Sequence, residues 1–530
     1  MRCRNCDRQP KRFSYVARVS FSRYLGLAST GESDAMAGQP DPTTLVPVTL
    51  QVGLFFDGTR NNADNLRRAS RPAGSTTPAA RPPASAVLAD DASPYQSRLT
   101  SSFSNGLTNI ARLHALYPDH RRTAPTRPGQ LSLAIYIEGA GTRTGKDDDL
   151  MGLAFGIGPS GVTSKVRQAL DIRLPEALRA LARSLPAHAL GSVRLDLFGF
   201  SRGAASARDA VNRLNATDGP AWLLEQLRRT GWQPAAGAVD RPVRFVGLFD
   251  TVVAIDARQR EAMPRVGLAP DCADKVVQLV ARDEHRHHFA LTSVAPQHEE
   301  IALPGVHANI GGGYDQRIEG PKLLTRPHGQ RLRNHGVADT APPPLAVLRA
   351  SQAYARAQAD CRHWQAALGL DEDSVWVDVW HRWQQMRVAG SNSVLPQWVL
   401  FAHAAVVLRR EIDWRYQLVA LRLMQQRAAA AGVSWTRAAD SDPALALPTE
   451  LQPIAAQLLR GQALEAAQES LLRQRYLMQS AHWNFDALGD TALLYAADDA
   501  TRELPYRPGP GLFYINRPTD DGKRVVLRNV

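Results

Sequence analysis

Residues Leu195 to Ala204 read LDLFGFSRGA and predict a serine held on a sharp turn between a strand and a helix. The residues before the turn are rich in Val, Leu and Phe, and the residues after it, RGAASARDAVNRL, contain no Pro and favour a helix of about three turns. Gly199 and Gly203 suit such a turn, because a Cβ atom would clash where strand and helix come close. The pattern places the Ser201 hydroxyl at a helix N-terminus, where free N–H groups stabilise negative charge.

A serine needs a base to become a nucleophile, and with this kind of turn the partners follow in the order Ser, acid, His. Asp250 ends the apolar run VRFVGLFDT, where a strand would bring it to the same edge of a parallel sheet. His307 lies in IALPGVHANIGGGY, between a short apolar run and three glycines that let backbone approach a ligand. We therefore expect Ser201 as nucleophile, His307 as general base, and Asp250 as the residue that orients the imidazole.

Each of these residues also has a structural alternative. Ser201 fits an ordinary tight turn, Asp250 fits a helix N-cap before Thr251, and His307 fits a loop histidine bonded to backbone. Four other histidines compete for the role of base: His285, His287, His288 and His298. Three of them lie in ARDEHRHHF, which is typical of a charged, solvated stretch and lacks the HExxH or Cys-pair spacing of a zinc site.

Taken together, GFSRGAA, the strand ending in FDTV, and PGVHANIGGGY resemble the α/β-hydrolase domain of bacterial type VI secretion lipase effectors of the first class. Two more segments fit in order, VGLFFDGTRNN (52–62) and IYIEGAGT (135–142), so the similarity spans residues 46–316. The family commonly has an acid where this chain has Asn309, and an aromatic or small residue where it has Arg60. A role that needs a carboxylate at position 309 is therefore in doubt.

The resemblance implies an α/β-hydrolase-like fold, a mostly parallel sheet with helices on both faces, and assigns Ser201, Asp250 and His307 the same roles as above. It implies a phospholipase of the A type that hydrolyses carboxylic esters of bacterial membrane phospholipids as an antibacterial effector. The implied partners are a phospholipid membrane, a secretion-spike carrier and a cognate immunity protein, with no nucleic acid. The protein would be made in the bacterial cytoplasm and delivered, without a signal peptide, to the periplasm or membrane of a target cell.

Two alternative functions remain open from the residues alone. One is a serine esterase or peptidase that acts on a soluble substrate. The other is a non-catalytic interaction protein built on the same scaffold.

An oxyanion hole needs two N–H donors directed at the developing charge. We expect the backbone of Arg202 as the first donor and the loop Gly139-Ala140-Gly141, after an early strand, as the second; a plain turn is the alternative for that loop. The turn Asp57-Gly58-Thr59 is expected to fix neighbouring loops by side-chain to backbone bonds, with substrate or ion binding as the alternative.

Three ligand-binding patterns are weaker. GIGPSG (156–161) satisfies GxGxxG, but no strand leads cleanly into it, and Gly145-Lys146 lacks the other residues of a phosphate-binding loop. The acidic run Asp147 to Asp149 is most often a solvated loop, and calcium binding there is the alternative. We expect no cofactor and no metal, apart from that option for calcium.

Composition sets the limits of size and charge. With 530 residues, of which 44% are apolar, the chain can bury a large core. Its formal net charge of +12 favours an anionic partner such as phospholipid headgroups or nucleic acid, although a mildly basic surface is the commoner explanation. Four cysteines are too few for a disulfide framework, and the lone pair Cys3 and Cys6 supports a zinc site only weakly.

Breaks in composition divide the chain. Residues 1–45 are basic, lack the apolar core of a signal peptide and are expected to be disordered. The catalytic domain covers 46–316 with a Pro-rich insertion at 65–98, and a polar linker covers 317–345. A largely helical module follows over 346–530.

Two segments of this module have distinctive patterns. WVLFAHAAVVL, Trp398 to Leu408, predicts a buried core helix or, as the alternative, a helix at a membrane interface, since its 11 residues are too few to cross a bilayer. The last residues, GLFYINRPTDDGKRVVLRNV, predict two strands around an Asp-Gly turn, and therefore a hairpin.

Overall fold

The computed structural model describes residues 47–59, 61–69, 96–97, 106–142, 161–185, 189–253, 264–315, 317–335, 343–386, 397–487, 512–513 and 516–529. Five predictions lie outside these residues: those for the N-terminal segment, for most of the Pro-rich insertion and of GIGPSG, for Gly145-Lys146, and for the acidic run Asp147 to Asp149.

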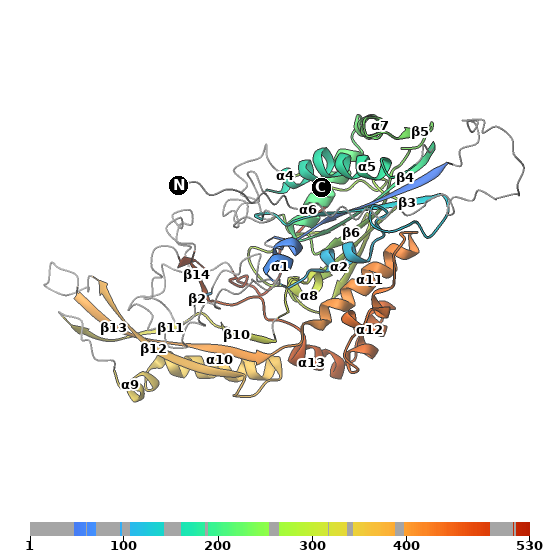
Figure 1. The fold of residues 1–530 in the computed structure, drawn as a ribbon. Helices are drawn as coiled ribbons and strands as arrows, with labels where there is room; N and C mark the ends of the chain where they lie inside the picture. Colours follow the sequence, from blue (N-terminus) through green and yellow to red (C-terminus); the bar gives the residue numbers. More distant parts are fainter. Residues whose placement is uncertain are drawn as a thin grey trace, which may run out of the picture.

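A seven-stranded sheet with only parallel pairings forms the centre of the molecule (Figure 1). Its order is β3-β1-β4-β6-β7-β9, with β5 also paired to β4. The strands are β1 (Val48–Phe56), β3 (Gln130–Ile137), β4 (Ala189–Phe200), β5 (Gln233–Pro234), β6 (Val243–Phe249), β7 (Lys275–Ala281) and β9 (Glu299–Leu303). Every residue of β6 is buried, as expected of a parallel strand covered on both faces.

Helices cover both faces of this sheet, so the predicted fold class is confirmed (Figure 1). Because neighbouring side chains of a strand point to opposite faces, Leu54 and Phe56 of β1 pack into one core and Phe55 into another. Five helical segments contribute to the first core: α4 (Val162–Arg167), the π-helix η3 (Gln168–Arg173), α5 (Leu174–Ala182), α6 (Arg202–Leu214) and α7 (Gly219–Arg229). The second core includes α2 (Asn109–Leu116), α8 (His307–Gly311) and α11 (Gln417–Ala430).

The second core extends past residue 316, where we expected the catalytic domain to end. Leu418 and Met424 of α11 are fully buried with Phe198 and Phe245 of the central sheet. The helices α12 (Leu451–Leu459) and α13 (Ala466–Arg475) add to the same cluster. Other short helices are α1 (Ala63–Ala69) and the 3-10 turns η5 (Trp414–Tyr416), η6 (Ala439–Ser441) and η7 (Pro443–Leu445).

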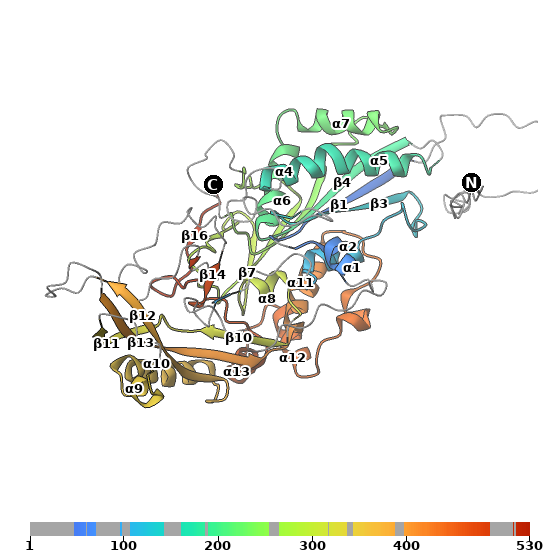
Figure 2. The same ribbon diagram turned by 60° about the vertical axis from the view of Figure 1, so that its left-hand side comes forward.

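A second, antiparallel sheet lies below the central one, with α9 (Leu345–Arg349) and α10 (Gln352–Leu368) beside it (Figure 2). Its strands are β10 (Ile318–Leu323), β11 (His328–His335), β12 (Val375–Met386) and β13 (Gln397–Glu411). The predicted linker 317–345 thus supplies two strands. β13 pairs with the other three strands of this sheet.

The helix predicted over Trp398 to Leu408 is wrong, because these residues belong to β13. A short apolar run suits a buried strand as well as a buried helix, and its periodicity does not distinguish the two. Val399 to Leu408 are all buried, so this stretch is core and does not contact a membrane surface. In the part of the chain that the structure describes, no helix combines the length and apolar character needed to span a bilayer.

The predicted C-terminal hairpin is also wrong, because its two strands pair with other strands and not with each other. β15 (Leu512–Phe513) joins β14 (Phe485–Ala487) and β2 (Gln96–Ser97), whereas β16 (Val526–Leu527) runs parallel to β8 (Leu291–Thr292). The Asp-Gly turn is present, with Gly522 at φ 67°. The last strand therefore lies against the segment that connects β7 to β9, close to the predicted site.

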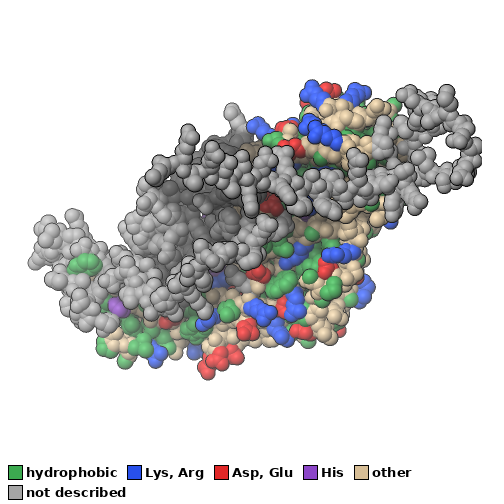
Figure 3. All heavy atoms as spheres, viewed as in Figure 1, with side chains coloured by type: hydrophobic (Ala, Val, Ile, Leu, Met, Phe, Trp, Pro, Cys, Tyr) green, Lys and Arg blue, Asp and Glu red, His purple; other side chains and the backbone are tan. Residues whose placement is uncertain are grey.

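Basic and acidic side chains are mixed over the lower face of the molecule (Figure 3). On the described residues of that face, blue and red groups alternate among hydrophobic ones. The net positive charge is therefore not gathered there into one basic patch.

Candidate active site

Ser201 occupies the sharp turn that the sequence predicts. It follows β4 and precedes α6, with backbone φ 58° and ψ −124°. Positive φ is unfavourable for a residue with a Cβ atom, and such strain is typical of functional turns. The turn is held by the bond that Ser201 N–H donates to the carbonyl of Phe249 over 3.0 Å.

The two glycines of the turn are required by close backbone contacts. A Cβ atom on Gly203 would lie 2.3 Å from the carbonyl oxygens of Phe56 and Asp57, and one on Gly199 would lie 2.5 Å from the carbonyl oxygen of Gly203. A side chain at Gly203 would push the serine turn away from the end of β1, and one at Gly199 would push the end of β4 away from the start of α6.

Asp250 and His307 form a buried pair, as the sequence predicts. Asp250 follows β6, has φ 46°, and is fully buried; His307 is the first residue of α8. Their Oδ2 and Nδ1 atoms lie 2.5 Å apart. This contact orients the imidazole with Nε2 available for proton transfer.

The structure brings Ser201 close to this pair without a direct contact to it. The ring of Phe200, the residue before Ser201, packs against the His307 ring at an interplanar angle of 33°, with centroids 4.6 Å apart. Among the described residues, no hydrogen bond joins the Ser201 hydroxyl to His307. Catalytic hydrogen bonds are often long in free enzymes and tighten when substrate binds.

The electrostatics of the pair favour a neutral base and an ionised acid. Burial lowers the pKa of His307 below its ordinary 6.5, although Asp250 acts in the opposite direction. Burial alone would raise the pKa of Asp250, but Arg524 and His307 outweigh it and hold that pKa well below its usual range. His307 can therefore accept a proton at neutral pH while Asp250 stays charged.

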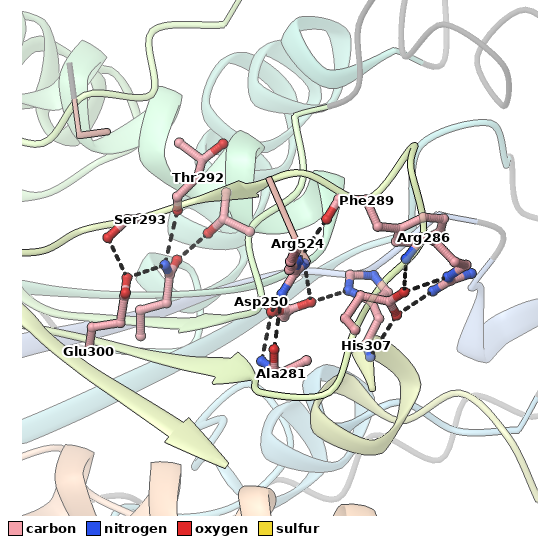
Figure 4. A network of polar contacts seen from close by, with 12 residues as sticks. Asp250, Ala281, Arg286, Phe289, Thr292, Ser293, Glu300, His307 and Arg524 are labelled. Carbon is pink, nitrogen blue, oxygen red and sulfur yellow. Dashed lines mark hydrogen bonds and ion pairs between the residues drawn. The ribbon is translucent and has the colours of Figure 1, made fainter. Parts of the chain in front are cut away.

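Sequence reasoning missed Arg524, which binds both oxygens of Asp250. Its Nη1 donates to Oδ1 over 2.7 Å and its Nη2 to Oδ2 over 2.8 Å, while its Nε donates to the carbonyl of Phe289. Asp250 thus lies between Arg524 and His307 (Figure 4). The only signal in the sequence was a cation beside the apolar residues of a predicted strand, which does not identify a partner.

A second buried carboxylate accepts a hydrogen bond from the backbone N–H of His307. Glu284 accepts a bond from the His307 N–H over 3.2 Å and is paired with Arg286. The Arg286 guanidinium stacks on Phe289, whose ring contacts His307 edge-on. The predicted charged stretch 281–289 therefore contributes a wall of the site as well as exposed residues.

The turn Asp57-Gly58-Thr59 is fixed as predicted and lies against the serine turn. Asp57 is buried, accepts bonds from Tyr136 Oη and Gly58 N–H, and burial raises its pKa to about 6. Thr59 Oγ1 accepts a 2.7 Å bond from Arg202 Nε. Asp57 therefore holds the loop in place.

Gly139 does not suit the predicted role of oxyanion donor. Its N–H already donates to the carbonyl of Asn61 over 2.9 Å, and a Cβ atom on it would collide with Gly58. Gly139 and Ala140 follow β3, which β1 separates from β4. The loop after β1 is thus closer to Ser201 than the loop after β3.

Asn309 has a structural role in place of the acid common in the family. Its side-chain oxygen accepts from Val306 N–H and Met478 N–H, and its amide donates to Tyr314 and Tyr476. It therefore caps α8 and ties it to residues beyond α13.

The rival histidines do not form an alternative centre. His287 and His288 are exposed, and His298 lies 4.0 Å from Cys272 Sγ. Within the described ranges, no group of three or more His, Cys, Asp or Glu side chains is arranged to hold a metal ion.

Residues 225–335, which contain Asp250 and His307, match the family model described as type VI secretion system phospholipase effector Tle1-like, catalytic domain. The predicted resemblance is confirmed. Over these residues the chain is similar to Tle1-like phospholipase effectors.

One solved structure has the same fold over nearly the whole chain. It is a Tle1 effector bound to the VgrG spike of the type 6 secretion system, with 24% identity, a TM-score of 0.63, and coverage of 94% of this chain and 98% of that chain. An uncharacterized protein from Pseudomonas aeruginosa matches at 20% identity and a TM-score of 0.28 over 52% of this chain and 42% of that chain. No curated protein matches the chain.

Proposed function

We propose that this Tle1-like chain is a serine-dependent phospholipase of the A type, with Ser201, His307 and Asp250 as its catalytic residues. The observation that carries the proposal is the buried Asp250–His307 pair beside a serine at φ 58°. The family match supports phospholipid as the substrate class.

In the proposed reaction, Ser201 Oγ attacks the acyl carbonyl carbon while His307 Nε2 takes its proton. The tetrahedral intermediate collapses when the ester C–O bond breaks, and His307 returns the proton to the leaving oxygen of the lysophospholipid. Water then attacks the acyl-serine with His307 again as base, which releases the fatty acid and restores Ser201. Asp250 stabilises the imidazolium in both steps.

The negative oxygen of the intermediate needs two donors near Ser201. The first N–H of α6, from Arg202, is one. For the second we favour the N–H of Thr59, because Gly58 N–H is already bonded to Asp57 and no described residue accepts a bond from Thr59 N–H. The side-chain bond from Arg202 to Thr59 keeps these two loops together.

Arg524 acts in this scheme as a positioning residue. It donates hydrogen bonds to both oxygens of Asp250, so the carboxylate keeps one orientation toward His307. It also keeps Asp250 ionised, because a cation favours the charged form of the acid beside it.

The test compares the parent with Ser201→Ala on two substrates, phospholipid vesicles and a soluble p-nitrophenyl ester. We expect the variant to lose at least about 10⁴-fold in activity on both, and a fluorophosphonate probe to label only the parent. Equal fatty-acid release by the two proteins would overturn the proposal. Activity on the soluble ester alone would favour the esterase alternative, and no labelling of the parent would favour a non-catalytic interaction protein.

Delivery by a spike protein completes the proposed function. The matching Tle1 effector is bound to VgrG, and 94% of this chain is covered by that match, so we propose a VgrG-type spike as carrier. Copurification of this chain with a VgrG-type spike protein from the same organism tests the carrier. Growth arrest on export to the periplasm of a bacterial host, abolished by Ser201→Ala, tests the target compartment. The immunity protein stays a prediction.

A further inference from the structure

The C-terminal strand exposes three consecutive apolar side chains next to the catalytic acid. Val525, Val526 and Leu527 are 48%, 57% and 47% exposed. Single exposed apolar residues are common, but a run of three on a folded surface indicates a function. The run follows directly after Arg524, whose guanidinium binds Asp250.

These residues are exposed although their backbone is firmly held. Leu291 N–H and Ser293 N–H donate to the carbonyls of Val525 and Leu527, each over 2.9 Å. Beyond them, Asn529 Oδ1 accepts from Arg208 Nη2 and from Leu268 N–H, each over 2.8 Å. The strand is thus anchored along its backbone and at its end, while its apolar side chains are left outside the core.

Exposed cations flank the run on both sides. Lys523 and Arg528 are exposed, and neither forms an ion pair with any described residue. Arg524 between them is neutralised by Asp250, and the exposed acids Asp520 and Asp521 precede Lys523, whose backbone N–H donates to Asp521 Oδ1. From Lys523 to Asn529 the outward face combines three apolar side chains with two exposed cations.

We infer that Val525, Val526 and Leu527 dock on the surface of an anionic phospholipid bilayer, with Lys523 and Arg528 against its headgroups. This inference rests on the proposed function and names the surface that brings the enzyme to its substrate. Apolar side chains flanked by cations suit the boundary between headgroups and acyl chains. Docking there places the bilayer beside the segment whose Arg524 binds Asp250.

The first test uses Val526→Asp, because Val526 is the most exposed of the three. Flotation with phosphatidylglycerol vesicles should show at least a tenfold loss of bound protein, and vesicle hydrolysis should fall in parallel. Activity on the soluble p-nitrophenyl ester and the melting temperature should stay near those of the parent. Vesicle binding equal to the parent's would overturn the inference and favour a protein partner on this strand.

A matched control is available on another surface. Ile172 is 53% exposed on η3, so Ile172→Asp adds the same charge in place of a comparably exposed apolar residue. It should bind and hydrolyse vesicles as the parent does. An equal loss in both variants would show that negative charge anywhere on the protein repels the vesicles, which would also overturn the inference.

A second variant tests the charges and guards against misfolding in the first. Lys523→Gln with Arg528→Gln changes only exposed side chains, and each lost cation should weaken binding to anionic vesicles about fivefold at low salt. Binding to phosphatidylcholine vesicles should change little. Unaltered binding to anionic vesicles would overturn the inference. Absence of soluble-ester activity in the parent would instead refute the proposed serine hydrolase. Failure of the docking inference and failure of the proposed function are therefore distinguishable.

Discussion

The apolar stretches in β13 and in the C-terminal strand β16 have opposite environments. Val399 to Leu408 form a continuous apolar run that is completely buried, whereas Val525 to Leu527 form a short run that is exposed. The difference follows from what packs on the faces of each strand, because Ala404, Val406 and Leu408 of β13 form clusters with residues of α10, whereas Val525 to Leu527 remain exposed. Hydrophobicity along the sequence therefore does not separate a core strand from a surface strand; the elements that cover its faces do.

The largest expected effect is the difference in unfolding free energy when the same substitution, Val→Asp, is made in β13 and in β16. Val406→Asp places a carboxylate at a position of zero exposure in β13, where no partner compensates its desolvation. We expect a loss of more than about 4 kcal/mol in unfolding free energy, and failure to fold if the parent is only marginally stable. Val526→Asp should change it by less than about 0.5 kcal/mol. Urea unfolding followed by circular dichroism measures both, and similar losses would refute the contrast.

The next effect concerns the inward side of the C-terminal segment. Arg524→Met removes both bonds that hold the Asp250 carboxylate, so His307 is no longer aligned. We expect kcat/KM on the soluble ester to fall about 100-fold, as for a misplaced catalytic group. Arg528→Met is the matched control, a cation of the same segment that is exposed, and should stay within about twofold of the parent. A parent-like Arg524→Met enzyme would mean that Asp250 does not depend on this pair.

A smaller effect separates anchoring of the segment from positioning of Asp250. Asn529→Ala removes the acceptor for Arg208 and Leu268, which should cost about 1–2 kcal/mol in unfolding free energy. Because Arg524 and the backbone bonds of β16 remain, soluble-ester activity should fall by less than about threefold. If Asn529→Ala loses as much activity as Arg524→Met, the segment acts as one unit and Arg524 has no separate role.

The sequence predicts those parts of the site that depend on local pattern. Ser201, Asp250 and His307 each lie where an apolar strand gives way to a turn or helix, and the structure places each of them there. Arg524 could not be predicted, because 274 residues separate it from Asp250 and the segment that carries it is placed by long-range contacts such as the parallel pairing of β16 with β8. The expected hairpin paired that strand with the wrong partner.

The sequence favours the loop at Gly139 as oxyanion donor because the order of the strands in the sheet cannot be read from the chain. Gly139 follows β3, but β1 lies between β3 and β4. The order of strands in a parallel sheet depends on crossover connections, which the chain order does not reveal. The neighbour of the serine turn is therefore the earlier loop at Asp57 to Thr59.

The smallest expected effect is a shift in the pH profile of the Arg524→Met enzyme. In the parent, burial holds the pKa of His307 below 6.5, so kcat/KM should rise with pH through a midpoint below 6.5 and then level off. Removing the guanidinium leaves the charge of Asp250 uncompensated, which stabilises the imidazolium and raises the pKa of His307. The acidic limb should therefore move to higher pH in Arg524→Met and stay in place in Val526→Asp, whose change lies on the outward side. A residue with a purely structural role would lower the plateau without moving this limb, so rates on the soluble ester between pH 4.5 and about 8 decide whether Arg524 acts on the catalytic pair itself.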